Sequence, residues 1–284
     1  MVVSDATEFH QPAWHYTFAG GLASVVCRFA IAPFDVLKIR MQVSQSSFLQ
    51  VLNTTLRNEG YRALWRGNVS AEFLYLIYGS TEFVVFSKSR VLTENLQLNK
   101  HVLNFLCGAL AGSCATIASY PFDTLRTQFA TSKEKPRFMP TVKNILQTRG
   151  TQGFFPGLKP TLYQIGPHVG LFFMAYRAIY SSLSPMGIAA SSSISGVLAG
   201  VAAKALLFPV DTIVKIMQVS NLQHPSFGQC FKTVLHTSGA GGFYRGLPIS
   251  IAKVAPGRAI TMLIYEETLR TLNKISPETE DASR

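Results

Sequence analysis

Three short runs with the same order of residues recur along this chain and restrict its fold more than any other feature. Each begins with proline, has aspartate two residues later and has a cation further on: Pro33-Phe34-Asp35-Val36-Leu37-Lys38, Pro121-Phe122-Asp123-Thr124-Leu125-Arg126 and Pro209-Val210-Asp211-Thr212-Ile213-Val214-Lys215. The three prolines are 88 residues apart both times. Such regular copies predict three structural repeats of nearly equal length, over residues 1–98, 99–186 and 187–284.

The residues around these runs are apolar. Residues 14–32 carry Arg28 as their one full charge, and only 14% of the chain is charged, against about 25% in soluble domains. A charge within such a segment is costly in lipid unless it pairs or faces water. The composition therefore predicts a membrane protein whose charges have specific tasks.

Each repeat has the same predicted plan: a long helix, a short amphipathic helix, a turn and a second long helix. The long segments are residues 14–43, 70–92, 101–130, 158–183, 188–219 and 247–272, and the short ones are 48–58, 139–148 and 227–236. Segments of about 20 residues or more are long enough to cross a bilayer. A proline inside several of them predicts kinks. The tail, residues 276–284, is expected to be polar and mobile.

The remaining composition disfavours several classes of function. The net charge is +11, but the cations are dispersed at the ends of apolar runs, which argues against a nucleic-acid partner. The four cysteines have no metal-binding spacing. No nucleophile–base set or phosphate-binding glycine loop is present, so we expect neither an enzyme nor a bound cofactor or metal. Residues 1–11 make a poor transit peptide, so any organelle address is expected to be internal.

The proline–aspartate–basic run is followed in two repeats by a glycine, four residues, an aromatic, a cation and a glycine, as in residues 60–67 and 239–246. Together these motifs resemble the mitochondrial carrier family over nearly the whole chain. The resemblance implies an all-α membrane protein, with six transmembrane helices in three pseudo-threefold repeats around a central cavity and three short matrix-side amphipathic helices. It also implies a monomer in the mitochondrial inner membrane, with its termini in the intermembrane space and cardiolipin at the short helices.

Family geometry implies that the motif charges close the matrix side of such a carrier by pairing between helices. Asp35 would pair with Arg126, and Asp211 with Lys38. Asp123 would face Val214, so Lys215, about 100° around the helix, could substitute only in part. Two good pairs and one defective pair are expected, with Gln42 and Gln218 as bracing side chains and Ala130 at the corresponding place. The alternative is that these charges only extend to the matrix surface.

The opposite, cytosolic gate is expected to be weak. The family pattern of an aromatic, an acid and a later cation is largely missing from the second helix of each repeat. Arg90 with Glu266 is the one obvious pair, and Tyr180 occupies another gate position. This departure keeps a channel or a proton leak open as an alternative function.

Ionisable residues inside the spans are functional candidates, and the family resemblance implies substrate contacts near Tyr75 and Tyr78, near Gln164 with His168, and near Lys253. The predicted substrate-binding residues come from both arguments. They are Arg28, Lys204, Lys253, Arg258, Tyr75, Tyr78, Glu82, Gln164 and His168. The cations suit phosphate oxygens, and the tyrosine rings suit an aromatic or cationic ring. A packing role for His168 and a helix–helix hydrogen bond for Glu82 are the alternatives.

Four stretches, residues 46–67, 77–83, 120–130 and 253–266, resemble the members of the family that carry thiamine pyrophosphate. This implies import of thiamine pyrophosphate and thiamine monophosphate by alternating access, in exchange for nucleotides. An adenine nucleotide or coenzyme A carrier needs the same cationic cluster and is the closest alternative. A membrane interaction protein that transports nothing is a third possibility.

Overall fold

The protein is described by a computed structural model over residues 13–93, 100–134, 137–184, 191–220 and 226–275. Within these ranges every regular element is a helix. The polar tail predicted for residues 276–284 lies outside the described residues.

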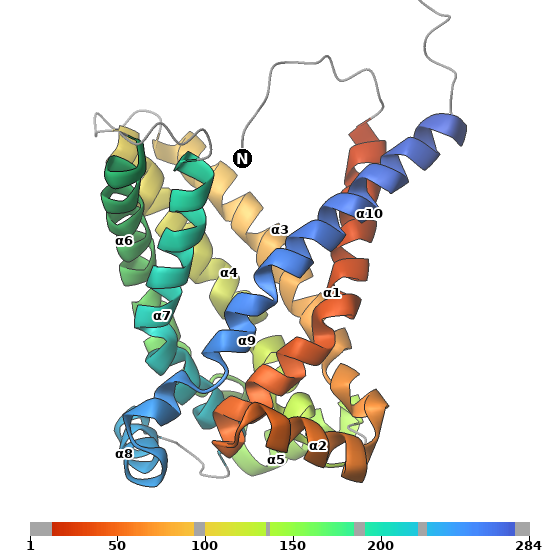
Figure 1. The fold of residues 1–284 in the computed structure, drawn as a ribbon, viewed down its shortest axis with the longest axis vertical. Helices are drawn as coiled ribbons and strands as arrows, with labels where there is room; N and C mark the ends of the chain where they lie inside the picture. Colours follow the sequence, from red (N-terminus) through yellow and green to blue (C-terminus); the bar gives the residue numbers. More distant parts are fainter. Residues whose placement is uncertain (1–12, 94–99, 135–136, 185–190, 221–225, 276–284) are drawn as a thin grey trace, which may run out of the picture. The chain divides into compact units, whose positions relative to one another are not determined.

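The helices follow the repeat plan predicted from the sequence (Figure 1). The long helices are α1 (Ala13–Ser44), α3 (Asn68–Thr93), α4 (Lys100–Thr131), α6 (Leu158–Leu183) and α7 (Ser191–Val219), followed by the pair α9 (Leu247–Ala252) and α10 (Val254–Ile275). The short helices are α2 (Phe48–Glu59), α5 (Phe138–Arg149) and α8 (Phe227–Ser238). Short 3₁₀ turns follow them: η1 (Tyr61–Trp65), η2 (Thr151–Phe154) and η4 (Ala240–Tyr244).

The last predicted span differs from the structure in one respect. Residues 247–272 were expected to form one kinked helix, but the helix stops after Ala252 and starts again at Val254. Pro256 has no N–H to donate to the Ala252 carbonyl, and its ring would collide with that carbonyl in a regular helix. The break leaves Lys253 outside regular helical geometry.

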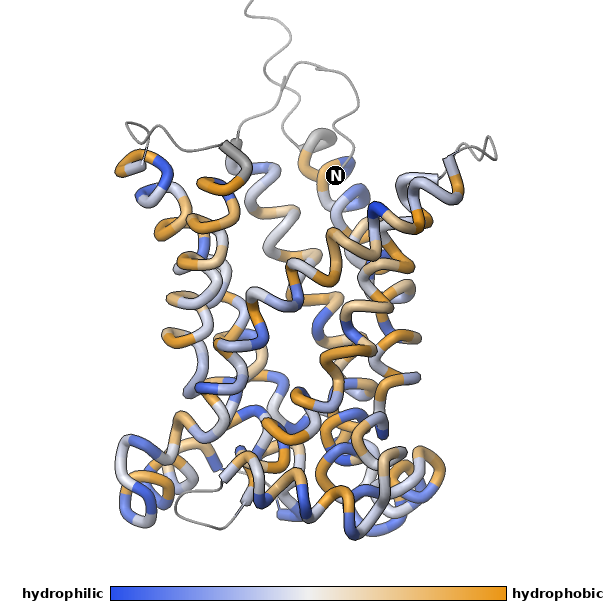
Figure 2. The backbone as a smooth tube through the Cα atoms, turned by 90° about the vertical axis from the view of Figure 1, so that its left-hand side faces the viewer, coloured by the Kyte–Doolittle hydropathy of each residue, from blue (hydrophilic) through white to orange (hydrophobic). Residues whose placement is uncertain are grey.

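Four segments within the described residues are long and apolar enough to cross a membrane: Tyr61–Thr93, Val102–Thr131, Ser191–Val219 and Ala240–Leu272. Figure 2 shows hydrophobic residues along the long helices and more hydrophilic ones in the short helices.

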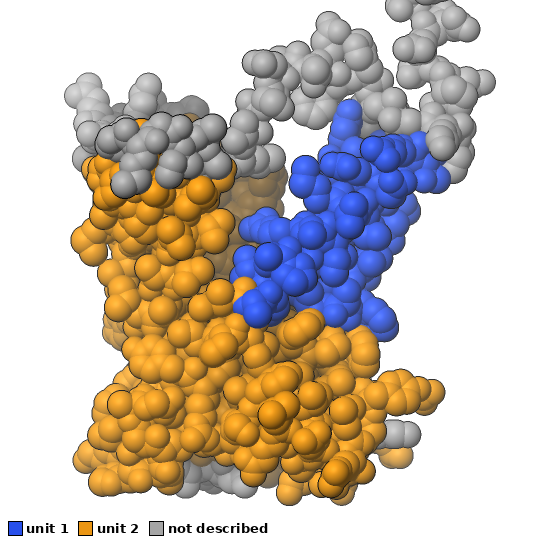
Figure 3. All heavy atoms as spheres, in the orientation of Figure 1, with its two compact units in different colours: residues 1–32, 252–284 blue, residues 33–251 orange. Residues whose placement is uncertain are grey.

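The chain divides into two compact units, residues 1–32 with 252–284 and residues 33–251 (Figure 3). In the first unit, the beginning of α1 packs on α10. The Cys27 thiol donates to the Gly257 carbonyl over 3.2 Å. A Cβ added at Gly257 would lie 3.8 Å from both Cys27 and Ile31, so this glycine allows the two helices to approach closely.

In the second unit the helices pair across the repeat boundaries. The second helix of the first repeat, α3, packs on α4, and α6 packs on α7. The turns after the short helices pack on the first helix of another repeat, α4 for the turn of the first repeat and α1 for that of the third. A Cβ at Gly67, where φ is +84°, would lie 2.8 Å from the Arg126 carbonyl oxygen, and one at Gly246, where φ is +90°, 3.2 Å from that of Lys38. Only glycine fits such positions easily.

Candidate functional site

The first unit contains a cavity that gathers three of the four predicted substrate-binding cations. Its volume is about 380 Å³, and it is lined by Ser24, Cys27, Arg28, Ile31, Lys253, Val254, Gly257, Arg258 and Thr261. Arg28 comes from α1, Lys253 from the break between α9 and α10, and Arg258 from the following turn of α10. These cations suit the oxygens of a phosphorylated anion.

The second unit contains a separate cavity of mixed charge. Its volume is about 430 Å³, and it is lined by Tyr78, Glu82, Gly108, Gly112, Thr161, Gln164, Ile165, His168, Val169, Lys204, Leu207 and Asp211. Five of the predicted substrate-binding residues therefore share one space. Both cavities fall within the usual size range of small-molecule sites.

Polar side chains of this second cavity contact one another. The Tyr78 hydroxyl donates to Glu82 over 3.5 Å, and Gln164 donates to the Asp211 carboxylate over 2.9 Å. Glu82 has its partner on its own helix, rather than on a neighbouring one, and its carboxylate lines the cavity. His168 also lines the cavity, so its position is compatible with a ligand contact.

Tyr75, a predicted substrate-binding residue, is not in the lining of either cavity. Its hydroxyl accepts a hydrogen bond from Arg126 over 3.3 Å, and its ring centroid is 5.8 Å from the guanidinium carbon. It therefore belongs to the layer of the motif charges. In the α-helix Tyr75 and Tyr78 are three residues apart, which puts the hydroxyl of Tyr75 nearly a turn closer to that layer.

Two expected groupings join residues of different units and remain predictions. Lys204 belongs to the second unit, whereas Arg28, Lys253 and Arg258 belong to the first. The predicted cytosolic pair has the same division, with Arg90 on α3 and Glu266 on α10. Tyr180, the third residue of the predicted cytosolic gate, stacks on Tyr176 with 5.8 Å between the ring centroids.

The first predicted matrix ion pair is formed. Arg126 Nη2 lies 2.7 Å from Asp35 Oδ2, and the two side chains are 12% and 9% exposed. The pair joins the first helix of repeat one to the first helix of repeat two. A nearly buried pair of this kind is stable only where further hydrogen bonds satisfy both partners, and Tyr75 supplies one of them.

The pair expected to be defective is well formed, which corrects the sequence-based expectation. Lys215 Nζ lies 2.8 Å and 2.7 Å from the two carboxylate oxygens of Asp123. Gln218 donates to the same carboxylate over 2.7 Å and accepts from Lys215 over 3.0 Å. A flexible lysine stem bridges the angular offset from Val214, and Gln218, one turn along α7, holds both groups. The spacing of Lys215 and Gln218 was the available signal for this arrangement.

Asp211 and Lys38, which were predicted to pair, each contact another residue. Asp211 accepts from Gln164, as described above, and Lys38 Nζ lies 5.3 Å from the Phe208 ring centroid. Gln42, a predicted brace, is fully buried and donates to the Thr212 hydroxyl over 3.1 Å. An Asp211–Lys38 pair stays a prediction.

A cluster that the sequence reasoning missed lies between α1, α2 and the end of α4. Arg40 donates to Glu59 over 2.6 and 2.8 Å, to Thr55 over 2.9 Å and to the Ala130 carbonyl over 2.7 Å. Arg66 pairs with the same carboxylate. Burial alone would raise the pKa of Glu59, but the bonds and charges of Arg40 and then Arg66 outweigh it and lower that pKa. The signal was a second cation two residues after Lys38 and an acid before Gly60.

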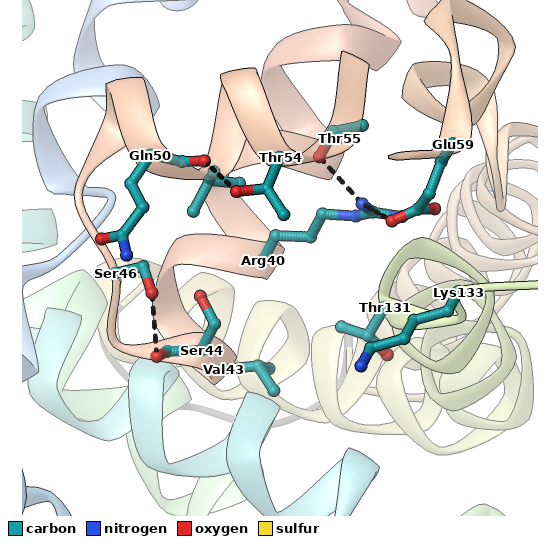
Figure 4. Close-up of a pocket in the computed structure, with 11 residues that line it drawn as sticks. Arg40, Val43, Ser44, Ser46, Gln50, Thr54, Thr55, Glu59, Thr131 and Lys133 are labelled. Carbon is teal, nitrogen blue, oxygen red and sulfur yellow. Dashed lines mark hydrogen bonds and ion pairs between the residues drawn. The ribbon is translucent and has the colours of Figure 1, made fainter. Parts of the chain in front are cut away.

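Beside this cluster is a cavity of about 320 Å³, shown in Figure 4. The side chain of Arg40 extends along it toward Thr55 and Glu59, with Thr131 and Lys133 on the opposite side. Because all three guanidinium nitrogens of Arg40 already donate to protein oxygens, this arginine has little capacity left for an added anion. The cluster therefore has the properties of a structural joint.

Comparison with known proteins agrees with the three repeats. A family model described as "Mitochondrial carrier protein" matches residues 9–95, 98–187 and 188–276. The chain is 57% identical, over 96% of both chains, to an uncharacterized mitochondrial carrier of Schizosaccharomyces pombe. It is 36% identical to a protein named mitochondrial thiamine pyrophosphate carrier 1 from Aspergillus terreus, over 89% of this chain and 91% of the relative. It is 33% identical to the protein of the same name from Scheffersomyces stipitis, over 93% and 92%.

One assignment follows from three observations: the in-phase repeats, the apolar helices with paired motif charges, and the matches along nearly the whole chain. The protein is a member of the mitochondrial carrier family, the solute transporters of the mitochondrial inner membrane.

Proposed function

We propose that this carrier imports thiamine pyrophosphate, and thiamine monophosphate, into the mitochondrial matrix in exchange for nucleotides. The observation that supports it best is the cavity that Arg28, Lys253 and Arg258 line together. Three cations that line one cavity offer several hydrogen-bond donors to a multiply charged anion. A pyrophosphate group has that charge and the oxygen atoms to match.

The mixed cavity of the second unit, considered by itself, has groups that suit a cationic aromatic ring. Thiamine carries a cationic thiazolium and an aminopyrimidine ring. Glu82 provides a negative charge, Tyr78 provides an aromatic face and a hydroxyl, and Gln164 and His168 provide polar contacts. These groups favour thiamine pyrophosphate over a ligand that is anionic throughout. Relatives named as thiamine pyrophosphate carriers add to this support.

The motif charges fit the matrix gate of an alternating-access cycle. Asp35–Arg126 and Asp123–Lys215 join first helices of successive repeats, so both pairs have to separate for the matrix side to open. Arg90, Tyr180 and Glu266 would close the cytosolic side, with both termini in the intermembrane space. We expect a monomer, with cardiolipin bound at the short matrix-side helices.

An adenine nucleotide or coenzyme A carrier is the closest alternative, because the cavity of Arg28, Lys253 and Arg258 suits any polyphosphate. The carboxylates of Glu82 and Asp211 in the second cavity should make those ligands bind more weakly than thiamine pyrophosphate, which still allows a nucleotide to be the counter-substrate. A channel or proton leak would differ in kind, since its flux needs no counter-substrate.

Uptake by purified protein in liposomes tests the proposal. Labelled thiamine pyrophosphate is supplied outside, with thiamine pyrophosphate, ATP, coenzyme A or buffer inside. We expect uptake only with an exchangeable substrate inside. Arg28→Ala and Lys253→Ala should each reduce the rate at least about tenfold, the effect of losing one charge-assisted hydrogen bond of about 1.5–3 kcal/mol. Lys143→Ala, on the exposed face of α5, is the matched control for reconstitution.

The outcomes separate the candidates. Exchange of ATP or coenzyme A, but not of thiamine pyrophosphate, would favour the alternative carrier. Uptake into liposomes with buffer alone, accompanied by ion current, would favour a leak. Unchanged thiamine pyrophosphate uptake in both Arg28→Ala and Lys253→Ala would remove the proposed site.

A further inference from the structure

A third space, mostly apolar, lies as a groove between α4 and α6 in the second unit. Its volume is about 500 Å³, and it is lined by Asn104, Phe105, Gly108, Ala109, Ile165, Gly166, Val169, Phe173 and Arg177. Most of this lining is apolar. The polar exceptions are Asn104 and Arg177, which makes the groove different in character from the two polar cavities.

The groove lies at the side of the mixed cavity. Gly108, Ile165 and Val169 line both spaces. The remaining apolar lining is open, with Phe105 44% and Phe173 57% exposed. At about 100° per residue, Phe173 and Gly166 are on the flank of α6 between the cavity-lining side and the side that exposes Tyr163 and Met174. The groove is therefore a lateral gap between two helices of one repeat, at the depth of the hydrocarbon.

The two polar side chains are near the same end of their helices. Asn104 is four residues after the start of α4, and Arg177 is six residues before the end of α6. At 1.5 Å per residue these positions are roughly 6 Å and 9 Å from the helix ends. Both positions are close to one end of the long helices, where a lipid head group is expected. Within the described residues, exposed Arg177 makes no hydrogen bond or ion pair, so its guanidinium can accept a ligand.

We propose that this groove binds an anionic phospholipid, with an acyl chain between α4 and α6 and the phosphate at Arg177 and Asn104. The apolar lining matches an acyl chain and does not match a hydrophilic phosphorylated solute. A guanidinium forms two parallel hydrogen bonds with a phosphate, and basic sites between membrane helices bind lipid head groups. The lipid would fill the space beside Gly108 and Gly166 and close the mixed cavity on this side.

Two substitutions test the two halves of the site. Arg177→Gln removes the charge and keeps a polar side chain. Gly166→Leu fills the groove, and since no atom lies within 4 Å of a Cβ placed there, the larger side chain should not disturb the backbone. The matched controls are Lys88→Gln, an exposed cation on α3, and Gly196→Leu, an equally open glycine on α7 outside the groove.

The measurement is native mass spectrometry of the purified carrier titrated with phosphatidylglycerol. We expect one phosphatidylglycerol to be retained, with about tenfold weaker retention in Arg177→Gln and none at this site in Gly166→Leu. Both controls should bind as the unsubstituted protein does. Thermal unfolding of all four variants shows whether each is folded.

Equal retention in Arg177→Gln and Lys88→Gln, or in Gly166→Leu and Gly196→Leu, would overturn the proposal. Retention of phosphatidylcholine as strong as that of phosphatidylglycerol would overturn the assignment of the head group to Arg177. Displacement of the lipid by thiamine pyrophosphate would show that the groove belongs to the substrate.

Discussion

Two joints of the molecule, both in the second unit, perform the same task with different chemistry. At the first joint, Arg40 and Arg66 meet at Glu59 and donate to carbonyls at the end of α4, those of Ala130 and Ser132. At the second joint, Arg149 alone donates to the Ser220 carbonyl just beyond α7. In each case a cation from one repeat meets the helix end of the next.

The shared element follows from the helix itself. The last carbonyls of an α-helix have no partner within the helix, and the negative end of its dipole favours a cation. The difference lies in the residue before the turn glycine, which is Glu59 in the first repeat and Arg149 in the second. A carboxylate there allows two arginines to lie close together. An arginine there has to act alone.

The second joint is consequently less well satisfied. One terminal nitrogen of Arg149, Nη1, is buried without a hydrogen-bond partner, and burial lowers the pKa of this guanidinium. At the first joint all three nitrogens of Arg40 donate. We infer that the first joint contributes more to the stability of the second unit, and that loss of the Glu59 carboxylate is the most destabilising change.

Glu59→Gln should have the largest effect. It leaves two arginines close together with no carboxylate between them, and breaking a buried ion pair by removing one partner costs about 3–5 kcal/mol. With Glu59 11% exposed, we expect about 3 kcal/mol of destabilisation, measured by denaturant unfolding in detergent.

Glu267→Gln is the control for this variant, since Glu267 pairs with Arg270 on α10 while 64% exposed. An exposed pair contributes little, so its unfolding should hardly change. Equal losses in Glu59→Gln and Glu267→Gln would show that the first joint is no stronger than a surface pair.

The pH dependence of stability should reveal the contribution of Glu59 to the first joint, and we expect this effect to be smaller than that of the substitution. The pKa of Glu59 is lowered from 4.5, so its contribution is fully present above about pH 4.5. It is lost as the pH falls through the lower, folded-state value. Unfolding measured from pH 7 down to pH 3 should therefore show the unsubstituted protein approaching Glu59→Gln at the acid end. A constant difference between the two proteins over this range would contradict a charged Glu59.

The sequence was sufficient to predict the helices and the repeats, because these depend on local pattern and on regular spacing, whereas one long-range ion pair was predicted from the family resemblance. Leu158–Leu183 has the bounds that were predicted, and Asp35 meets Arg126 as family spacing implies. The break at Lys253 was missed because Pro256 was interpreted as a kink, although its missing N–H can also end a helix.

The sites were harder to predict because side-chain reach is not visible in spacing. Lys215 was judged by its angular position, but its long stem and the partner Gln218 complete the pair with Asp123. The joint of Arg40 and Arg66 was overlooked because, besides Glu59, it depends on the Ala130 and Ser132 carbonyls, which are backbone atoms of another repeat. The lateral groove has no sequence motif, since the space between α4 and α6 depends on how the two helices pack.

The smallest effect, and the most direct test of the comparison, comes from giving the second joint the residues of the first. Arg149→Glu alone should destabilise the protein, because a carboxylate would face the Ser220 carbonyl at the negative end of α7. Gln128, seven residues after Pro121, corresponds to Arg40, seven residues after Pro33. In Gln128→Arg with Arg149→Glu, the new arginine can pair with the new carboxylate and donate to the end of α7. Unfolding of the two single variants and the double variant should yield a favourable coupling of about 1 kcal/mol. Additive losses would mean that the first joint depends on more than its charges, since the second repeat has Pro156 where the first has Arg66.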